Sequence, residues 1–171
     1  MRRAFEFTIG LAIILVAVAS LYNARNMPPP SRGNRPITLD YYIDVQGNTT
    51  SLEAYRGDYL WVNYAAERCD YCGPQSEALR TLDRQYGDKL IFITLITSTE
   101  KLAEAPSAGT ALDWADRYGL AHDRVLAYYS TRPLPYHILY SPAGDILYEG
   151  AGPLSIDQIV DIIRAKTPLL N

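Results

Sequence analysis

The sequence predicts an α/β domain with a central mixed sheet flanked by helices, preceded by a separate hydrophobic segment at the N-terminus. Strand-like and helix-like segments alternate from residue 36 onward, a pattern typical of parallel strands joined by helical crossovers. Nearer the C-terminus, two strand-like segments are separated by a short turn, which indicates an antiparallel hairpin in the same sheet. We therefore expect residues 36–171 to form one domain.

The N-terminal segment is predicted to be a transmembrane or signal helix over residues 1–26. Two arginines precede Phe7–Ala24, a run of eighteen residues without a charge. As a helix this run would be about 27 Å long, close to the hydrocarbon core of a bilayer, which is roughly 30 Å thick. The basic start favours export of the rest of the chain. Small residues at 17–19 leave cleavage as a signal peptide open, and the Pro-rich residues 27–35 are interpreted as a linker.

The first half of the domain is expected to contain three strands, a short helical turn and one long helix. Strand-like residues run from Ile37 to Val45 and lead into a Gly-Asn turn, and a helical turn follows at Ser51–Tyr55. Tyr59–Ala66 is a mostly apolar run, as expected of a strand buried on both faces. A helix then extends to about Tyr86, because apolar residues recur at helical spacing, and Lys89–Thr97 forms a second buried strand.

The second half is expected to begin with a helix over Ser107–Tyr118, which a glycine ends. A short strand follows at Val125–Tyr129. The hairpin strands are Tyr136–Tyr140 and Ile146–Tyr148, on either side of a Pro-Ala-Gly-Asp turn. Ser155–Ala165 has an apolar stripe at helical spacing and is predicted to be the closing helix.

The composition excludes several classes of protein. The 171 residues suit one domain with a short appendage, and a hydrophobic fraction of 48% excludes wholesale disorder. A net charge of −3 does not supply the basic face that nucleic acid requires. Two cysteines are too few for a multi-bridge disulfide scaffold. The chain has no Gly-rich nucleotide fingerprint, so no organic cofactor is implied.

The two cysteines stand three positions apart, as Cys69-Asp70-Tyr71-Cys72, directly after a predicted buried strand. Disulfide exchange needs an exposed, low-pKa thiolate that attacks a partner disulfide and a second thiol that resolves the mixed disulfide. Cys69 is expected near the start of the following helix, where the helix dipole stabilises a thiolate. Arg68 assists this effect and Asp70 opposes it. Because Asp70 disfavours the thiolate, we expect the pair to be more reducing than one whose two central residues include a histidine.

Other interpretations of the pair remain open. A purely structural disulfide is one, although structural bridges usually close longer loops. A zinc site would need two more ligands, and the spacing of His122 and His137 does not match that of zinc fingers. Covalent haem attachment needs a histidine after the second cysteine, where Gly73 stands.

Three segments carry a resemblance to a known family. Ser51–Gly57 is similar to an "S-L-x-x-Y-[RK]-G" segment, and Leu60–Ala66 to a "v-l-v-N-F-W-A" strand that precedes a CxxC pair. Pro135–Tyr140, with Gly144 nine residues after the proline, is similar to a "P-T-T-F-L-I-D-x-x-G" block. Over residues 36–166 the chain therefore resembles the thioredoxin superfamily, specifically the TlpA/ResA-like (redoxin) membrane-anchored thiol–disulfide oxidoreductases.

The resemblance implies a thioredoxin-like fold and a role for each residue of the site. Cys69 would be the attacking thiol and Cys72 the resolving thiol, while Pro135, rather than Pro133, would form a cis peptide bond beside them. Tyr71 and Tyr136 flank the predicted pair, and together with Leu134 they are expected to bind the protein substrate. No metal is expected in the enzyme.

The resemblance also implies a cellular setting. The substrates would be thiols of apocytochrome c or of a copper chaperone, and an upstream membrane thiol reductant would regenerate the pair. The domain would face the periplasm from the bacterial inner membrane, or be secreted there if the N-terminal segment is cleaved.

Several positions depart from the family pattern. Arg68 and Ala65 stand where the family usually has tryptophan, so the site is expected to lack aromatic cover. Asn63 fits the family strand, whereas thioredoxins proper have a buried Asp there that assists proton transfer. If the helix began only at Pro74, Cys69 would lose the assistance of the helix dipole.

One further alternative is a Sco-like copper-binding protein with Cys69, Cys72 and His137 as ligands. Its cysteine spacing would be CxxxC, which this chain does not have.

Overall fold

The structure, a computed structural model, describes residues 41–97 and 107–170. The predicted transmembrane or signal helix, the linker and the first part of the strand expected from Ile37 lie outside the described residues. Among the residues that are described, no helix combines the length and the apolar character needed to cross a membrane.

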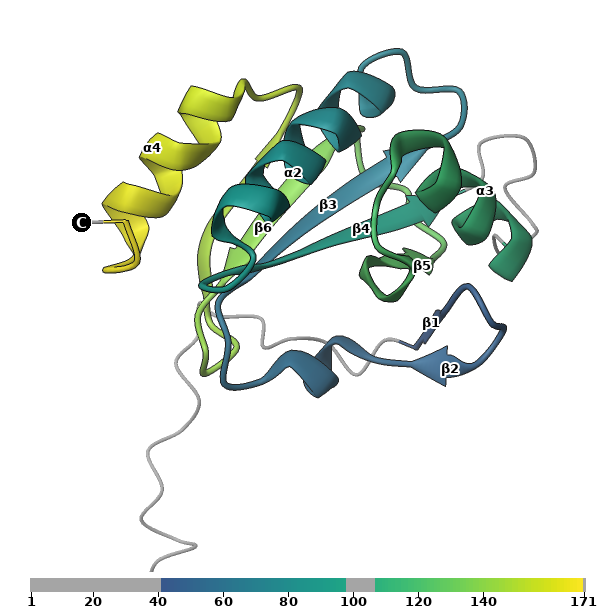
Figure 1. The fold of residues 1–171 in the computed structure, drawn as a ribbon, viewed down its shortest axis with the longest axis horizontal. Coiled ribbons are helices and arrows are strands. Elements are labelled where there is room, and N and C mark those ends of the chain that lie inside the picture. Colours follow the sequence, from purple (N-terminus) through teal and green to yellow (C-terminus); the bar gives the residue numbers. More distant parts are fainter. Residues whose placement is uncertain (1–40, 98–106, 171) are drawn as a thin grey trace, which may run out of the picture. The chain divides into compact units, whose positions relative to one another are not determined.

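A mixed sheet of seven strands forms the centre of the described part of the chain, in the order β2-β1-β5-β4-β3-β6-β7 (Figure 1). β3 (Leu60–Ala66) lies parallel to β4 (Ile91–Thr97) and antiparallel to β6 (Tyr136–Tyr140). β5 (Val125–Ala127) continues the parallel part beside β4, and β7 (Ile146–Ala151) forms a hairpin with β6. These pairings confirm the predicted mixed sheet, with parallel crossover strands and an antiparallel hairpin.

The first predicted strand ends earlier than expected. β1 (Tyr42–Ile43) turns back on β2 (Thr49–Thr50) as a short antiparallel hairpin. The Asp44 carboxylate accepts hydrogen bonds from the backbone N–H groups of Gln46 and Asn48, at 2.9 and 2.8 Å. These local bonds pull the chain into a turn directly after Ile43, so the strand does not reach Val45.

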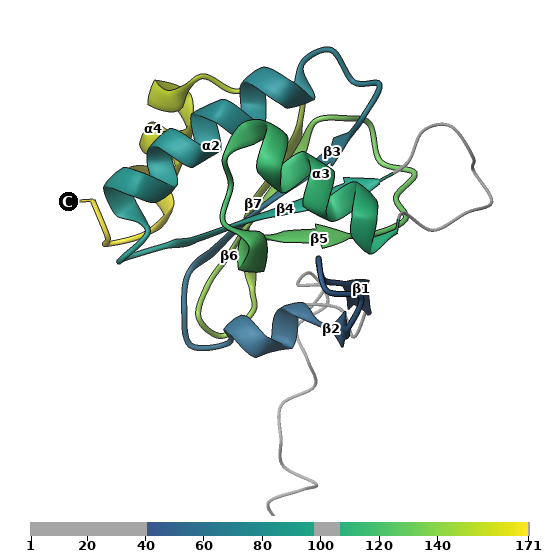
Figure 2. The same cartoon turned by 45° about the vertical axis from the view of Figure 1, so that its right-hand side comes forward.

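Three α-helices of the described residues cover one face of the sheet. α2 (Cys72–Tyr86) connects β3 to β4, α3 (Ala108–Tyr118) connects β4 to β5, and α4 (Ile156–Lys166) follows β7. The short helical turns are η1 (Leu52–Tyr55) and η2 (His122–Arg124). Figures 1 and 2 show α2, α3 and α4 on one side of the sheet and η1 on the other, while β1 and β2 are the strands beyond β5 at one edge. The predicted helices and strands are thus found, with ends that differ by a few residues.

Local sequence signals set both ends of α3 and the start of α4. Ser107 caps α3 through the N–H of Thr110, and Gly119 ends it in the left-handed conformation, with φ of 62°. α4 begins with a capping box in which the side chains of Ser155 and Gln158 each bind the backbone of the other residue.

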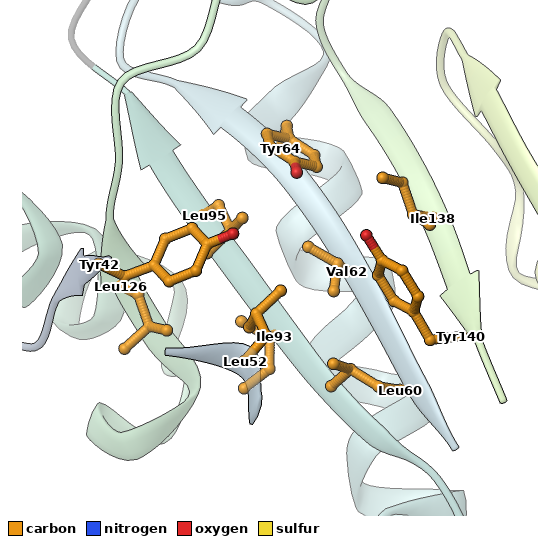
Figure 3. Close-up of a cluster of buried hydrophobic side chains, with 10 residues drawn as sticks. All are labelled: Tyr42, Leu52, Leu60, Val62, Tyr64, Ile93, Leu95, Leu126, Ile138 and Tyr140. Carbon is orange, nitrogen blue, oxygen red and sulfur yellow. The ribbon is translucent and has the colours of Figure 1, made fainter. Parts of the chain in front are cut away.

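The central strand β3 is buried along its whole length, as its apolar sequence predicted. Because side chains alternate along a strand, Leu60, Val62 and Tyr64 point to the face covered by β1 and η1. Figure 3 shows them packed against residues of β4 and β6 in a cluster of aliphatic and tyrosine side chains. Trp61 and Ala65 point to the opposite face and pack in the clusters beneath the helices. We call these two sides the apolar face and the helix face.

Candidate redox site

The two cysteines form a disulfide at the point where β3 ends and α2 begins. Their Cα atoms are 5.3 Å apart. The N–H of Cys69 donates to the carbonyl of Ala66 at 3.2 Å, and the N–H of Cys72 donates to the carbonyl of Cys69 at 3.0 Å. These tight turns place both sulfur atoms at the carboxyl end of the central strand.

The two cysteines differ in accessibility. Cys72 is completely buried, with 0% exposure, and packs in the apolar cluster that contains Ala65 and Trp114. Cys69 is half-buried at the edge of the same cluster. An incoming thiol or disulfide can therefore contact Cys69, while Cys72 has no exposed surface. This asymmetry is what an attacking and a resolving thiol require.

α2 begins at Cys72, with Tyr71 as its N-cap residue, and not at Pro74. Pro74 stands in the first helical turn, where its missing N–H removes no hydrogen bond of the helix. The N–H of Gln75 completes this turn by donating to the carbonyl of Tyr71 at 3.1 Å. The cystine therefore lies at the positive end of the helix dipole.

The Leu134–Pro135 peptide bond is cis. Of Pro133 and Pro135, this is the proline that the resemblance indicated. In the register of β3 and β6, Tyr136 lies opposite Tyr64, so Pro135 precedes β6 at the same end of the sheet as the cysteines. Pro135 is buried, and its carbonyl accepts the N–H of Gly152 at 2.9 Å. Leu134 packs against the cluster that holds Cys72. The structure thus brings Leu134 and Pro135 to the cysteine pair.

The two tyrosines named as binding residues occupy different positions. Tyr71 is 62% exposed at the start of α2, next to the pair. Tyr136 packs against the apolar face of the sheet, where its ring centroid is 6.0 Å from that of Tyr64. Its hydroxyl donates to Glu149 at 2.9 Å, and burial, followed by this carboxylate, raises the pKa of Tyr136. Tyr136 therefore lies at the same end of the sheet as the cysteines but on the opposite face.

Sequence reasoning missed the aromatic cover that α3 supplies. Trp114 packs in the cluster that contains Cys72, and its Nε1 donates to the hydroxyl of Ser76 on α2 at 3.1 Å. Tyr118 packs on Trp114 and lies over Gly73, where an added Cβ would be 2.6 Å from the tyrosine hydroxyl. The expectation that Ala65 and Arg68 leave the site without aromatic residues is therefore wrong, because a separate helix provides them.

A second unexpected feature is a group of buried polar side chains beneath α2. Asn63 on β3 lies directly opposite His137 on β6, and both side chains are completely buried. The carbonyl of Gly152 lies 3.2 Å from Nε2 of His137, and the side-chain oxygen of Gln75 accepts the N–H of Leu154 at 2.8 Å. His137 and Gln75 thus bind the same short loop between β7 and α4. The sequence shows that Asn63, Gln75 and His137 are polar, but it does not show that they come together in the fold.

Burial sets the protonation state of His137. It lowers the pKa of the imidazole from 6.5 to about 4, against the opposing effect of the Gly152 carbonyl. The ring is therefore neutral at pH 7. Because a carbonyl can only accept, Nε2 carries the proton and Nδ1 presents an unprotonated lone pair.

Residues 41–97 and 107–170 contain no cluster of ligands of the kind that the metal-binding alternatives require. Within these ranges no three His, Cys, Asp or Glu side chains gather in a way that could hold a metal ion. His122 is exposed and pairs with Asp116 on α3 at 2.8 Å, whereas Nε2 of His137 faces the Gly152 carbonyl.

Comparison with known proteins identifies the fold. No protein-family model and no curated protein sequence matches the chain. A thiol:disulfide interchange protein of the thioredoxin family from Chlorobium tepidum superimposes with a TM-score of 0.61 at 13% identity, over 80% of this chain and 99% of that one. An exposed lipoprotein thioredoxin from Streptococcus pneumoniae gives 0.56 at 18% identity, over 74% and 98%.

A secreted Mycobacterium tuberculosis disulfide oxidoreductase gives a TM-score of 0.57 at 13% identity, over 74% of this chain and 95% of its own. The described domain therefore has a thioredoxin-like fold, and the predicted resemblance is confirmed at the level of the fold.

Proposed function

We propose that the protein is a thiol–disulfide oxidoreductase that exchanges disulfides with protein partners through Cys69 and Cys72. The observation that carries the proposal is a disulfide between a half-buried and a completely buried cysteine at the start of α2. The cis bond before Pro135 and the thioredoxin-like neighbours support it. A structural disulfide would not need one sulfur to be open to solvent.

The exchange proceeds in two balanced steps. The thiolate of reduced Cys69 attacks one sulfur of a partner disulfide, and the other partner sulfur leaves as a thiolate. The Cys72 thiol then loses its proton and attacks Cys69, which releases the second partner sulfur as a thiolate. The partner gains two electrons, and the Cys69–Cys72 disulfide forms.

We propose that the protein works as a reductant, of disulfides formed by apocytochrome c or copper-chaperone thiols. Asp70 is exposed beside Cys69, and its negative charge disfavours the thiolate, which makes the disulfide harder to reduce. An upstream membrane thiol reductant would then regenerate the pair. Equilibration with glutathione tests this direction, and a potential near −120 mV, at the oxidising end of the known range, would contradict it.

We propose an extracytoplasmic location, with the domain tethered to the bacterial inner membrane or released into the periplasm. The uncharged run over residues 7–24 and its basic start support export. Two of the structural neighbours are described as exposed and as secreted. Fractionation of cells that express the full chain distinguishes a tethered from a released protein.

We propose Tyr71 and Leu134 as partner contacts, because the first is exposed and the second packs beside the pair. We assign Tyr136 a supporting role at the same rim. There the Arg132 guanidinium lies 4.6 Å from the centre of its ring.

Trapping of mixed disulfides tests the activity. In the Cys72→Ser variant, partners should accumulate as adducts through Cys69 that a reductant releases and mass spectrometry identifies. The Cys69→Ser/Cys72→Ser double variant is the matched control and should trap nothing. If Cys72→Ser captures no more protein than this control, the proposed activity is wrong.

A further inference from the structure

The buried polar cluster, which we define as Asn63, Gln75 and His137, is the starting point. These side chains are at most 2% exposed and come from β3, α2 and β6. Asn63 and His137 are cross-strand partners, while Gln75 and His137 both bind the loop that contains Gly152 and Leu154. Two strands, a helix and a loop thus converge on one polar site within the helix face.

This cluster lies next to the cystine. Gln75 follows Cys72 by three positions on α2, so their side chains are neighbours on one side of the helix, about 5–6 Å apart at Cβ. Asn63 precedes Ala65 by two positions on β3, and Ala65 packs in the cluster that holds Cys72. His137 follows Pro135 by two positions, a rise of about 7 Å. The polar cluster is therefore the next layer beneath the disulfide.

Most polar atoms of the cluster have no partner among the described residues. These atoms are both amide atoms of Asn63, Nε2 of Gln75 and Nδ1 of His137. Nε1 of the adjacent Trp61, whose ring centroid is 5.6 Å from that of His137, has none there either. Buried polar groups are nearly always paired, and groups placed in this way are the typical lining of a site for ordered water.

His137 is the one acid–base group in this layer. The buried polar residues of the described ranges are Asn63, Gln75, Ser76, Thr94, Thr97, His137 and Thr167. Of these seven, only the imidazole is an acid–base group. A buried Cys72 thiol must lose its proton before it can attack, and the described protein offers no buried carboxylate to receive it.

We propose that His137 receives the proton of Cys72 during resolution, through water held by the amides of Asn63 and Gln75. This role rests on the proposed function. The S–H bond of Cys72 breaks, the proton reaches Nδ1 of His137, and the thiolate attacks Cys69. The imidazolium then gives its proton to the departing partner thiolate or to solvent. In the reverse reaction, His137 returns a proton to the leaving Cys72 thiolate.

The protonation state of the site suits this role. Neutral His137 keeps an unprotonated Nδ1, and a thiolate at Cys72 would favour the imidazolium by its negative charge. The neighbouring elements place two titratable groups near this layer: Cys72, three positions before Gln75 on α2, and Tyr148 on β7, whose hydroxyl lies over Gly150, the cross-strand partner of His137. In β3 and the Gly152–Leu154 loop, the residues beside the imidazole do not titrate.

Stopped-flow reaction of the reduced full chain with Ellman's reagent, 5,5′-dithiobis(2-nitrobenzoate), separates the two steps. Attack by Cys69 releases the first thionitrobenzoate in a step whose rate depends on reagent concentration. Resolution by Cys72 releases the second at a rate that does not. In His137→Gln and His137→Phe, we expect the second step at pH 7 to slow at least about tenfold, in line with general base catalysis. The first step should change by less than about twofold, because Cys69 is partly exposed and its attack does not depend on the proton of Cys72.

Matched variants separate proton transfer from packing. His122→Gln removes the exposed histidine and should leave both steps unchanged. Adding Gln75→Glu to His137→Gln puts a carboxylate into the same cluster and should restore much of the second step. The pH profile is a further readout, because without the base the second rate should keep rising with hydroxide to high pH.

Four outcomes overturn the inference. An unchanged second step in folded His137→Gln shows that the imidazole is not the acceptor, as does equal slowing of both steps. If the wild type releases no thionitrobenzoate, the proposed function fails as well. Should the variants fail to fold, the pH profile of the wild-type second step decides: its rate must level off above the pKa of the imidazole, and a rate that rises in proportion to hydroxide throughout refutes the role.

Discussion

The apolar face and the helix face of the same sheet are packed in different ways. The apolar face holds aliphatic and tyrosine side chains, such as Val62 and Ile93, in one continuous cluster (Figure 3). On the helix face, Asn63, Gln75 and His137 interrupt the apolar packing. The cystine lies on the same face, at the carboxyl end of β3. The apolar face therefore contributes mainly to the stability of the fold. The helix face buries polar groups beside the cystine, and this burial lowers its contribution to stability.

Truncation of the apolar face is the most direct way to break this comparison. Ile93 is completely buried, so Ile93→Ala should lower the free energy of unfolding by about 2–5 kcal/mol, through lost burial and the cavity that remains. Urea unfolding followed by circular dichroism measures the loss. The rate of Cys69 attack on Ellman's reagent should be unchanged well below the melting temperature. Ile156→Ala, at a residue 36% exposed, is the control and should cost less than about 0.5 kcal/mol.

A loss below about 1 kcal/mol in Ile93→Ala would contradict a stabilising role of the apolar face. A marked loss of exchange rate in the same folded variant would contradict the division between the faces.

Acidification should lower the free energy of unfolding, because His137 on the helix face is buried in its neutral form. The pKa of His137 is about 4 in the folded protein and 6.5 when exposed. Between these values the unfolded chain binds more protons, so the contribution of His137 is fully present above pH 6.5 and is lost as the pH falls to 4. The expected loss is about 3 kcal/mol. Urea unfolding across this range measures it.

His137→Gln should remove that part of the pH dependence, while His122→Gln should keep it. The lowered pKa of Asp44 acts below 3.8, outside this window. An identical pH dependence in wild type and His137→Gln would show that the imidazole is not buried as described.

The contact between α3 and α2 tests how the helix face is held together. Trp114→Phe keeps an aromatic ring but removes the donor to the buried Ser76 hydroxyl. We expect a loss of about 1–2 kcal/mol, because that hydroxyl is left without its partner. Ser76→Ala in the Trp114→Phe background should then cost little. Additive losses in this double-mutant cycle, measured by urea unfolding, would mean that the hydrogen bond contributes nothing.

The smallest effect is expected at the rim of the apolar face. The Arg132 guanidinium lies 5.3 Å from the ring centre of Tyr64 and 4.6 Å from that of Tyr136. Arg132→Met keeps the apolar stem and should cost about 0.5–1 kcal/mol in thermal unfolding. Arg164→Met, which breaks an exposed pair with Asp161, is the comparison. If both variants lose the same stability, the contact of Arg132 with the two rings contributes no more than an exposed ion pair.

The sequence predicted those elements whose signals are local. β3 is a continuous apolar run, and α3 has its Ser107 cap and terminal glycine, so both were predicted nearly to the residue. The first strand was placed too far along the chain because the side chain of Asp44 competes with strand pairing through local hydrogen bonds.

The site was predictable in part. The cysteines and the cis-proline position followed from motifs. The opposite direction of Tyr136 also follows from strand alternation, since Pro135 and His137 share one face and Tyr136 takes the other. The pairing of Asn63 with His137 depends on the register between strands far apart in sequence. The aromatic cover depends on how α3 docks. Neither has a local signal.

The burial of Cys72 has a consequence for oxidative damage. A peroxide can reach the sulfur of Cys69 in the reduced protein, but not that of Cys72 directly. A sulfenic acid formed at Cys69 lies within reach of the neighbouring thiol, which condenses with it to a disulfide and releases water. Oxidation therefore stops at a state that a thiol reductant reverses, before the sulfinic acid forms. The burial of Cys72 beside a partly exposed Cys69 thus protects the pair against irreversible oxidation.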